Sequence, residues 1–429
     1  METPKSFDPE AIAADIVARA DALSGEEAVA LIGKRIAPNY GLLMDDPIVR
    51  GEGAWLTTRS GKRIFDGVAA YSAANLGHGH PVIKAAIKAF LDSGAPPVLG
   101  RFLPDPYLAL FGREISRISG FDRFLPANGG VEAPEAAIKL ARRWAHHVKG
   151  VNGTPEILYC EGCFHGRTLT VTQMLDPAEE SARTGFEPWA EGFRRIPFGD
   201  VEAVAAAAGP NTAAILVEPI QGEGGINIPP EGYLSDLRKL ATEKNFLLIL
   251  DEVQTGWGRT GEMFRFMHEG EVARPDVLCV GKSLSGGFAP ISGILAGDEL
   301  LSLLGPGSHG STFGGSPLSS CIALAALAAI EAEDLPAQAK EKGEWLSEQL
   351  ELIATGSPHV KEIRGAGMMF GIELNRGGPD GHDVCLKLLE IGLLAKDTHR
   401  WVIRFTPPVT ASRNDLEFAI DALRKGLAR

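Results

Sequence analysis

Residues 245–261, NFLLILDEVQTGWGRTG, contain the stretch from which the fold class can be predicted. A run of apolar residues from Phe246 to Leu250 is followed directly by Asp251 and Glu252. An unbroken apolar run bounded by charge and glycine predicts a strand that is buried on both faces, as in a parallel sheet. In open α/β sheets, ligands bind beyond the carboxyl ends of the strands, so an acid at this place can face a ligand. The alternative is that Asp251 caps a helix that follows the strand.

The length and composition of the chain fit a soluble α/β enzyme. With 429 residues, of which 45% are hydrophobic, the chain is long enough for two or more domains with large cores. The net charge of −13 argues against nucleic acid or an anionic membrane as a partner. No apolar run approaches the length of a membrane span, and the N-terminus shows no apolar core of a signal peptide. We therefore expect a cytoplasmic protein.

The cysteines and histidines do not indicate a disulfide framework or a metal centre. The five cysteines are an odd number in a long chain. Cys160 and Cys163 form a C-x-x-C pair, but no second pair or histidine pair follows at zinc-finger spacing. His78 and His80 lie in a glycine-rich turn, NLGHGHP, without a third candidate ligand nearby. We expect no metal.

Helical segments alternate with short apolar runs between about residues 80 and 300. The clearest runs are EILYC, AAILVEP, FLLILDE and DVLCVGK. This alternation predicts a mainly parallel sheet with crossover helices. Before it, residues 8–35 predict one or two amphipathic helices opened by Asp8-Pro9-Glu10, and residues 50–66 predict a hairpin with Ser60-Gly61 at its turn.

The chain is expected to divide into three segments. Residues 1–62 form an N-terminal segment that belongs to a small domain, residues 63–318 form a large domain, and residues 319–429 form the rest of the small domain. The last segment opens with a long predicted helix, SSCIALAALAAIEAEDL. Its later helix and strand patterns follow no strict order, which favours an α+β fold.

Reactive side chains follow four of the predicted strands. Glu218, Asp251 and Lys282 each come at the end of an apolar run, and EILYC leads into EGCFHGRT. The carboxyl ends of parallel strands meet at one edge of the sheet, so these residues are expected to lie together. Lys282 at the end of a buried strand is a candidate Schiff-base nucleophile, because desolvation lowers the pKa of an amine. The alternative is an ordinary solvated lysine.

Pyridoxal phosphate is a cofactor that needs such an acid and such a lysine together. Its ring withdraws electrons well only when a carboxylate keeps the ring nitrogen protonated, and its aldehyde bonds to a lysine. Gly129-Gly130-Val131, in LPANGGVEAPEAAIKLARRW, opens a predicted helix whose N-terminus can bind phosphate. The residues of this helix expected to face the core are Ala137, Leu140, Ala141, Trp144 and Val148.

Long motifs make the chain resemble the class III aminotransferases of the fold-type I pyridoxal-phosphate enzymes from about residue 35 to the C-terminus. They are FHGRT, VEPIQGEGG, DEVQTGWGRTG, GKSLSGG and HGSTFGGSP. The resemblance implies a large domain with a mainly parallel seven-stranded sheet and a smaller α+β domain made of the N- and C-terminal segments. It also implies that Asp251 pairs with the ring nitrogen of pyridoxal 5′-phosphate and that Lys282 bonds to its aldehyde.

The same resemblance implies further contacts with the cofactor. Phe164 and Val253 sandwich its ring, and Gln254 bonds its phenolic oxygen. Gly130 and Val131 bind its phosphate through their backbone. Thr312 reaches the phosphate in a neighbouring subunit, which implies a homodimer with shared sites. Gly129 departs from the threonine or serine that is usual in the family, which is tolerable where the phosphate contacts are made by the backbone.

Within this class, the segments YSAANLGHGHP, GGVEA, GLLAKDTH and VIRFTPP resemble those of the ornithine aminotransferases. The substrate residues implied by this resemblance are Tyr40, Tyr71, Arg167, Glu223 and Arg404. Arginines suit substrates that carry carboxylates, because a guanidinium binds a carboxylate bidentately; the alternative for Arg404 is a structural ion pair. The segment that follows Tyr40 is slightly longer than in that family.

The reaction implied is transfer of the δ-amino group of L-ornithine to 2-oxoglutarate, which gives glutamate 5-semialdehyde and L-glutamate. Three alternatives stay open. The chain could act on acetylornithine, 4-aminobutyrate or lysine, although Tyr71 and the Glu223/Arg404 pair favour ornithine. It could be an aminomutase, which needs no 2-oxo acid. It could also be a cofactor-binding regulator, although it lacks an added basic DNA-binding region.

Overall fold

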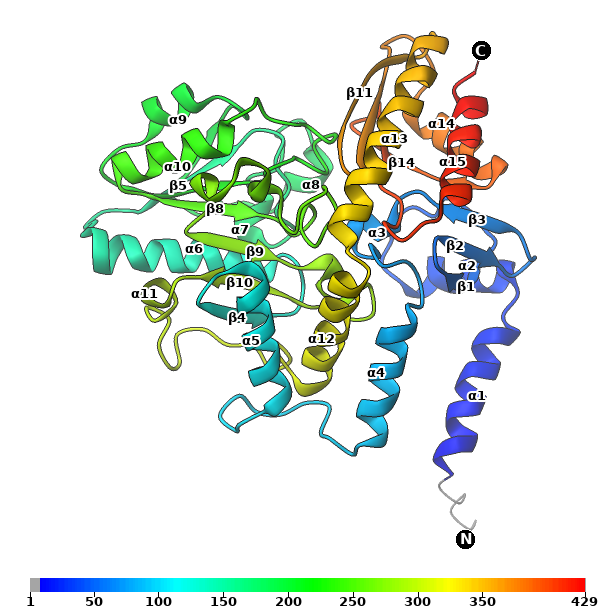
Figure 1. Ribbon diagram of the computed structural model, residues 1–429, viewed down its shortest axis with the longest axis horizontal. Helices are drawn as coiled ribbons and strands as arrows, with labels where there is room; N and C mark the ends of the chain where they lie inside the picture. Colours follow the sequence, from blue (N-terminus) through cyan, green and yellow to red (C-terminus); the bar gives the residue numbers. More distant parts are fainter. Residues whose placement is uncertain (1–7, 429) are drawn as a thin grey trace.

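A seven-stranded sheet forms the centre of the larger part of the molecule in the computed structural model, which describes residues 8–428 (Figure 1). The strands pair in the order β4-β10-β9-β8-β7-β5-β6. All neighbours from β9 to β6 are parallel, and only β10 runs antiparallel to its two neighbours. The predicted mainly parallel sheet is therefore confirmed. Its strands are β4 (Arg123–Ala127), β5 (Glu156–Cys160), β6 (Phe193–Ile196), β7 (Thr212–Val217), β8 (Leu247–Asp251), β9 (Val277–Val280) and β10 (Ser292–Ala296).

Helices cover both faces of this sheet, which explains the unbroken apolar run in β8. Leu247 and Ile249 pack in one core cluster with the helix that follows β4, whereas Leu248 and Leu250 pack in a second cluster with helices of the opposite face. Each residue of β8 is thus buried on whichever side it points. The helix of the first face is α6 (Glu132–Trp144), and those of the second face are α5 (Pro106–Ser119), α9 (Val201–Ala207), α10 (Tyr233–Lys244) and α12 (Pro317–Ala332).

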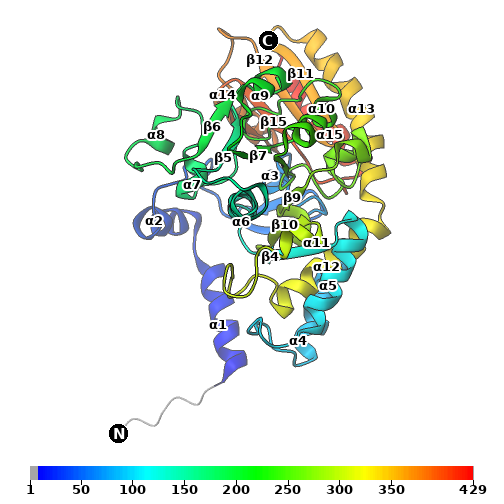
Figure 2. The same cartoon turned by 90° about the vertical axis from the view of Figure 1, so that its left-hand side faces the viewer.

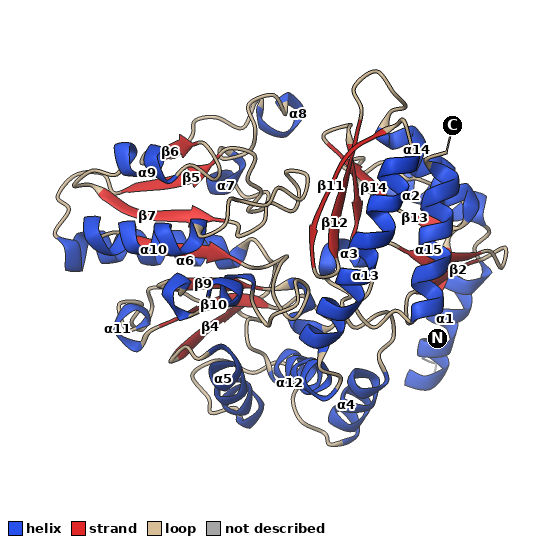
Figure 3. Ribbon diagram, turned by 45° about the horizontal axis from the view of Figure 1, so that its top comes forward, coloured by secondary structure: helices blue, strands red, loops and turns tan. Residues whose placement is uncertain are grey.

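Two smaller sheets lie beside the large sheet and join the two ends of the chain (Figures 1 and 3). The first has the order β1-β2-β3-β13, in which the C-terminal β13 pairs parallel with β3. The second is antiparallel throughout, in the order β11-β12-β15-β14. This is the smaller α+β unit expected from N- and C-terminal segments. Its strands are β1 (Ile48–Glu52), β2 (Trp55–Thr58), β3 (Arg63–Asp66), β11 (Val360–Ala366), β12 (Met369–Leu374), β13 (Leu393–Leu394), β14 (Lys396–Thr398) and β15 (Val402–Phe405).

The expected hairpin corresponds to β2 and β3, and β1 adds a third strand in front of it. Helices α13 (Leu335–Gly356), α14 (Gly381–Ile391) and α15 (Arg413–Gly426) complete the smaller unit. The predicted boundary at 318/319 falls inside α12, which packs on α5 and on α4 (Pro81–Asp92). The predicted boundary at 62/63 falls just before β3, which pairs with β2. The three-segment division stays a prediction.

Two helices form the N-terminal part, as the sequence predicts. Asp8 accepts hydrogen bonds from the first turn of α1 (Pro9–Ala22), and Ser24 forms a capping box with Glu27 in α2 (Gly25–Arg35). Helix α1 extends away from the rest of the chain (Figures 1 and 2) and has no buried residue. Its C-terminal end is held by the guanidinium of Arg59, which donates to the carbonyls of Ala20 and Asp21.

One predicted core position is wrong. Val148 is 60% exposed, whereas Ala137, Leu140, Ala141 and Trp144 are buried as expected. The reason is that α6 ends at Trp144 and the chain continues as a π-helical turn over residues 145–149, which changes the direction in which side chains point. Within residues 8–428, no helix is both long enough and apolar enough to cross a membrane.

Candidate active site

The carboxyl ends of the parallel strands bring the predicted residues around one cavity of about 300 Å³. Asp251 is the last residue of β8, Lys282 follows β9, and Glu218 follows β7. The loop after β5 adds Phe164 and His165. The other lining residues are Ala73, Asn128, Gly129, Gly130, Val131, Gly166, Glu223, Val253, Gln254, Ser285, Gly287, Ala289, Pro290 and Ile291.

Asp251 is buried at the floor of this cavity and holds two hydrogen bonds. Its Oδ1 accepts from the backbone N–H of Val253 at 3.1 Å, and its Oδ2 lies 2.7 Å from Nδ1 of His165. The N–H of Val253 belongs to a turn and not to a helix, so Asp251 is not a helix cap. Its carboxylate instead supplies a negative charge to the cavity, with both oxygens oriented by neighbours.

His165 also belongs to the site, although its role could not be predicted from the sequence alone. Its side chain is fully buried, and its Nε2 has no hydrogen-bond partner within residues 8–428. Burial alone would lower the pKa of His165. The neighbouring Cys163 and Asp251 raise it by more than burial lowers it, so the pKa lies well above its usual range. The imidazole therefore acts as a fixed donor to Asp251. Its place in FHGRT, directly after Cys163 and Phe164, was the available signal.

Lys282 is placed in a strained turn directly after β9. It begins a 3₁₀ turn (Lys282–Ser285) with a φ of 44°, a region that non-glycine residues rarely occupy. Backbone strain of this kind concentrates at functional sites. Burial lowers the pKa of the Lys282 amine, although the carboxylates of Glu223, Asp251 and Glu218 oppose this effect. The amine is thus more easily deprotonated than an exposed lysine, which a nucleophile or base requires.

Glu218 joins the two loops that border the cavity. Its carboxylate accepts from the backbone N–H of Phe164 at 2.8 Å and from that of Gly222 at 3.2 Å. Burial, with the charge of Asp251 nearby, raises the pKa of Glu218 to about 7. The strand-end position of this acid could be predicted from the sequence, but its bond to Phe164 could not, because that N–H group comes from another loop.

The turn before α6 presents open donors to the cavity. The N–H of Gly129 donates to the side chain of Glu132 at 2.7 Å. The N–H groups of Gly130 and Val131, by contrast, find no acceptor within residues 8–428. Both residues line the cavity at the N-terminus of α6, where the helix dipole favours an anion.

Phe164, Val253 and Gln254 all line the cavity. The ring of Phe164 also lies against Arg167, whose guanidinium carbon is 5.4 Å from the ring centre. A Cβ atom on Gly222 would overlap the carboxamide of Gln254. A larger residue at position 222 would therefore displace the carboxamide of Gln254 from its present place in the cavity.

Glu223 and Arg404 form an ion pair beside the cavity. Nη1 of Arg404, on β15, donates to Oε1 of Glu223. Arg404 is only 5% exposed, and its guanidinium carbon lies 4.9 Å from the ring centre of Tyr71. Nε of Arg404 has no partner within residues 8–428. The guanidinium thus retains unused hydrogen-bonding capacity for a carboxylate.

Tyr71 reaches Arg404 from an uncommon left-handed turn. Residues 69–72 all have positive φ, from 47° at Ala69 to 69° at Ser72. The C-terminal part of the chain holds this turn, because Thr406 donates its N–H to Gly67 at 2.7 Å and its hydroxyl to the carbonyl of Val68 at 2.9 Å.

Five of the predicted residues do not line the cavity itself, although two of them, Tyr71 and Arg404, lie beside it with Glu223. Tyr40 is 81% exposed, and the exposed Thr312 lines a separate cavity with Arg101 and His309. Arg167 is also exposed at the rim, near Phe164. One chain therefore brings together Asp251, Lys282 and the Glu223–Arg404 pair, but not the complete set of predicted residues.

Comparisons with known proteins agree with this geometry. The family model described as aminotransferase class-III matches residues 37–427. Ornithine aminotransferase 2 of Staphylococcus saprophyticus is 44% identical over 402 residues, which cover 93% of this chain and 98% of the relative. An ornithine aminotransferase structure from Toxoplasma gondii, described as having partial occupancy of PLP at its active site, superposes with a TM-score of 0.92 at 35% identity, covering 96% of this chain and 97% of that one. The acetylornithine aminotransferase of Elizabethkingia anophelis has a TM-score of 0.83 at 34% identity, covering 95% and 99%.

Proposed function

The chain belongs to the class-III aminotransferase family, and from this premise we propose that it transfers the δ-amino group of L-ornithine to 2-oxoglutarate, giving glutamate 5-semialdehyde and L-glutamate. The observation that carries the choice of substrate is the ion pair between Glu223 and Arg404, packed against Tyr71 beside the cavity of Lys282. The relatives named ornithine aminotransferase support it.

The residues of the cavity fit pyridoxal 5′-phosphate. The open N–H groups of Gly130 and Val131 would hold its phosphate, and the carboxylate of Asp251 would face its ring nitrogen. Lys282 supplies the amine that its aldehyde requires. Phe164 and Val253 would pack on the two faces of its ring, and Gln254 would bond its phenolic oxygen. When bound, the cofactor withdraws electrons from the carbon that bears the amino group and carries that group between the two substrates.

The side chains of the chain itself have separate tasks in this reaction. Asp251 keeps a proton on the ring nitrogen by its charge, and His165 orients that carboxylate through Nδ1. The amine of Lys282, which its lowered pKa makes available in the neutral form, takes the proton from Cδ of ornithine. Burial of these groups excludes water and strengthens the electrostatic interactions among them.

Glu223 selects which end of the substrate reacts. While Glu223 occupies Arg404, the carboxylate of ornithine turns to Arg167 and Tyr40, and the δ-amine enters the cavity. Glutamate must react through its α-amine, so Glu223 has to leave Arg404 free to bind the α-carboxylate. The unpartnered Nε of Arg404 supports this second role, because a bidentate carboxylate would use it.

A second copy of the chain would complete the site. Thr312 is exposed and lies away from the cavity, as a residue that contacts the phosphate of a neighbouring subunit would be. Helix α1 exposes Ile12, Ile16 and Val17, an apolar set for which a partner subunit would provide cover. A homodimer is therefore part of the proposal.

A cytoplasmic location is also proposed, because all five cysteines are free thiols.

The decisive experiment couples purified protein with ornithine and 2-oxoglutarate, and traps the cyclised semialdehyde. A trapped product that depends on both substrates supports the proposal. If N-acetylornithine, 4-aminobutyrate or lysine reacts with 2-oxoglutarate faster than ornithine does, that amine is the preferred donor and the proposed substrate is wrong. Catalytic conversion of an amine substrate to an isomer that keeps its amino group, without a 2-oxo acid, would indicate an aminomutase. No turnover with any amine would indicate a cofactor-binding regulator.

A further inference from the structure

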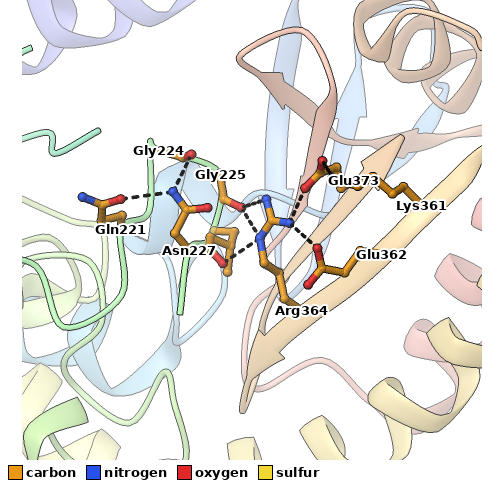
Figure 4. Close-up of polar contacts among 9 residues, drawn as sticks. Gln221, Gly224, Gly225, Asn227, Lys361, Glu362, Arg364 and Glu373 are labelled. Carbon is orange, nitrogen blue, oxygen red and sulfur yellow. Dashed lines mark hydrogen bonds and ion pairs between the residues drawn. The ribbon is translucent and has the colours of Figure 1, made fainter. Parts of the chain in front are cut away.

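The loop that carries Glu223, residues 221–227, is closed at its base and is named the gate loop below. Gln221 and Asn227 exchange two backbone hydrogen bonds, of 3.0 and 3.1 Å. The side chain of Asn227 donates to Oε1 of Gln221 and to the carbonyl of Gly224, at 3.1 and 3.0 Å (Figure 4). These contacts fix the base of the loop but do not reach the carboxylate of Glu223.

Arg364, on β11 of the small antiparallel sheet, holds the far side of the gate loop. Its Nη2 and Nε donate to the carbonyl of Gly225 at 2.8 and 3.0 Å, and Nε also reaches the carbonyl of Ile226 at 3.1 Å (Figure 4). Nη1 donates to Glu373 at 2.6 Å and to the more exposed Glu362 at 3.3 Å. The side chain is only 15% exposed, so the guanidinium is locked between the sheet and the loop.

Arg364 and Arg404 lie in one row across the sheet with a glycine between them. Arg364 pairs with Gly371 on β12, and Gly371 pairs with Arg404 on β15. Directly paired residues of an antiparallel sheet point to the same face, so both guanidinium groups stand on the side of the gate loop. A Cβ atom on Gly371 would lie 2.9 Å from the carbonyl oxygen of Gly225. The gate loop therefore lies on the sheet in the space that Gly371 leaves between the two arginines.

The gate loop is strained where Arg364 holds it. Ile226 has a φ of 56°, and a β-branched residue in this region is a true outlier. Such a conformation persists only when the surroundings enforce it. On the other side, the hydroxyl of Thr398 on β14 donates to the carbonyl of Glu223 at 2.6 Å.

We infer that Arg364 is a positioning residue for substrate selection: it holds the gate loop so that Glu223 covers Arg404. This inference rests on the proposed gating role of Glu223. Without Arg364, Gly225 and Ile226 lose their common donor, the strain at Ile226 is released, and the carboxylate of Glu223 moves off Arg404. The α-carboxylate of ornithine can then bind Arg404, which brings the wrong amine to Lys282.

The variant Arg364→Met tests this inference. The holoenzyme is mixed with ornithine or with glutamate, and the rate of a single turnover is measured from the absorbance of the cofactor. The loss of hydrogen bonds from a charged donor should lower the δ-amine rate with ornithine roughly tenfold. The rate with glutamate should be unchanged or higher. Arg364→Lys should be intermediate, because an ammonium keeps the charge but not the planar fork that bridges two carbonyls. Amide hydrogen exchange in residues 221–227 should be faster in Arg364→Met than in the wild type.

Glu362→Gln is the matched control, since it removes the negative charge from a partner of Arg364 that does not contact the gate loop. Both rates should equal those of the wild type. Equal loss of both rates in Arg364→Met would show a merely structural role and overturn the inference. If Arg364→Met keeps the selectivity of the wild type but Glu223→Ala loses it, the inference about Arg364 is overturned, whereas the proposed role of Glu223 stands. If Glu223→Ala itself keeps wild-type selectivity, the gate fails, and the inference fails with it.

Discussion

Replacing Asp251 by asparagine removes a charge from the centre of the site and leaves its shape. The asparagine side chain is the same size, and its carbonyl oxygen can still accept from the backbone N–H of Val253. Its amide would donate to Nδ1 of His165, so the imidazole would give up its Nδ1 proton and keep the proton on Nε2, which has no other partner within the described chain. The phosphate turn at Gly130 is untouched. We therefore expect Asp251→Asn to bind pyridoxal 5′-phosphate.

The expected cost falls on turnover. Asp251 is 6% exposed, so its charge acts in a medium that screens far less than water. Two unit charges 4 Å apart interact by about 4 kcal/mol at an effective dielectric constant of about 20. Loss of that interaction from the transition state corresponds to roughly a thousandfold in rate. Carboxamide hydrogen bonding recovers little of it, because an amide cannot hold the proton on the ring nitrogen by charge.

The assay separates binding from chemistry. Cofactor content is measured by absorbance after gel filtration, and the rate of a single turnover is measured with ornithine in stopped flow. Asp236→Asn, which changes an acid on α10 away from the cavity, is the matched control and should behave as the wild type. A wild-type rate in Asp251→Asn would refute the electrostatic role and leave Asp251 only its bonds to Val253 and His165.

Three other side chains give separate tests. Lys282→Ala should lose the visible absorbance of the bound cofactor and all multiple turnover, and full activity would contradict the cavity as the active site. Glu223→Ala should lose at least tenfold in preference for the δ-amine of ornithine while the glutamate half-reaction persists, as single-turnover rates and product analysis would show. Glu218 has a folded pKa of about 7, raised above that of the unfolded chain, so it destabilises the fold progressively as pH rises from about 4.5 through 7. The stability advantage of the wild type over Glu218→Gln should therefore shrink by about 2.5 kcal/mol between pH 5 and pH 8. A pH-independent difference in thermal unfolding would refute this.

The positions of Asp251 and Lys282 could be predicted because their local sequence carries the information. Each follows an apolar run, and parallel strands bring their carboxyl ends to one edge. The burial of β8 between two layers of helices could be predicted from the same apolar run. The end of α6 could not be predicted, because Val148 continues the helical spacing although the chain has already entered a π-helical turn at Ala145.

The partners within the site depended on contacts between distant segments. His165 meets Asp251, and Glu218 meets Phe164, only because the loops after β5 and β7 fold over the same cavity. Arg364 had no sequence signal, since its function follows from its register with Gly371. The positions of Tyr40 and Thr312 show a different limit: both lie outside the cavity of a single chain, so their proposed roles concern an assembly.

The left-handed turn at residues 69–72 lies against a segment from the C-terminal part of the chain. Left-handed backbone costs roughly 1–2 kcal/mol per non-glycine residue. Asp66 bonds the start of the turn, and Thr406 bonds the carbonyls of Gly67 and Val68 directly before it. The strand before the turn also pairs with Leu393 and Leu394. The bonds that precede Tyr71 therefore require a residue that follows Val68 by 338 positions in the chain. On the proposed role of Tyr71, we expect that loss of these C-terminal contacts would misplace the ring that packs against Arg404.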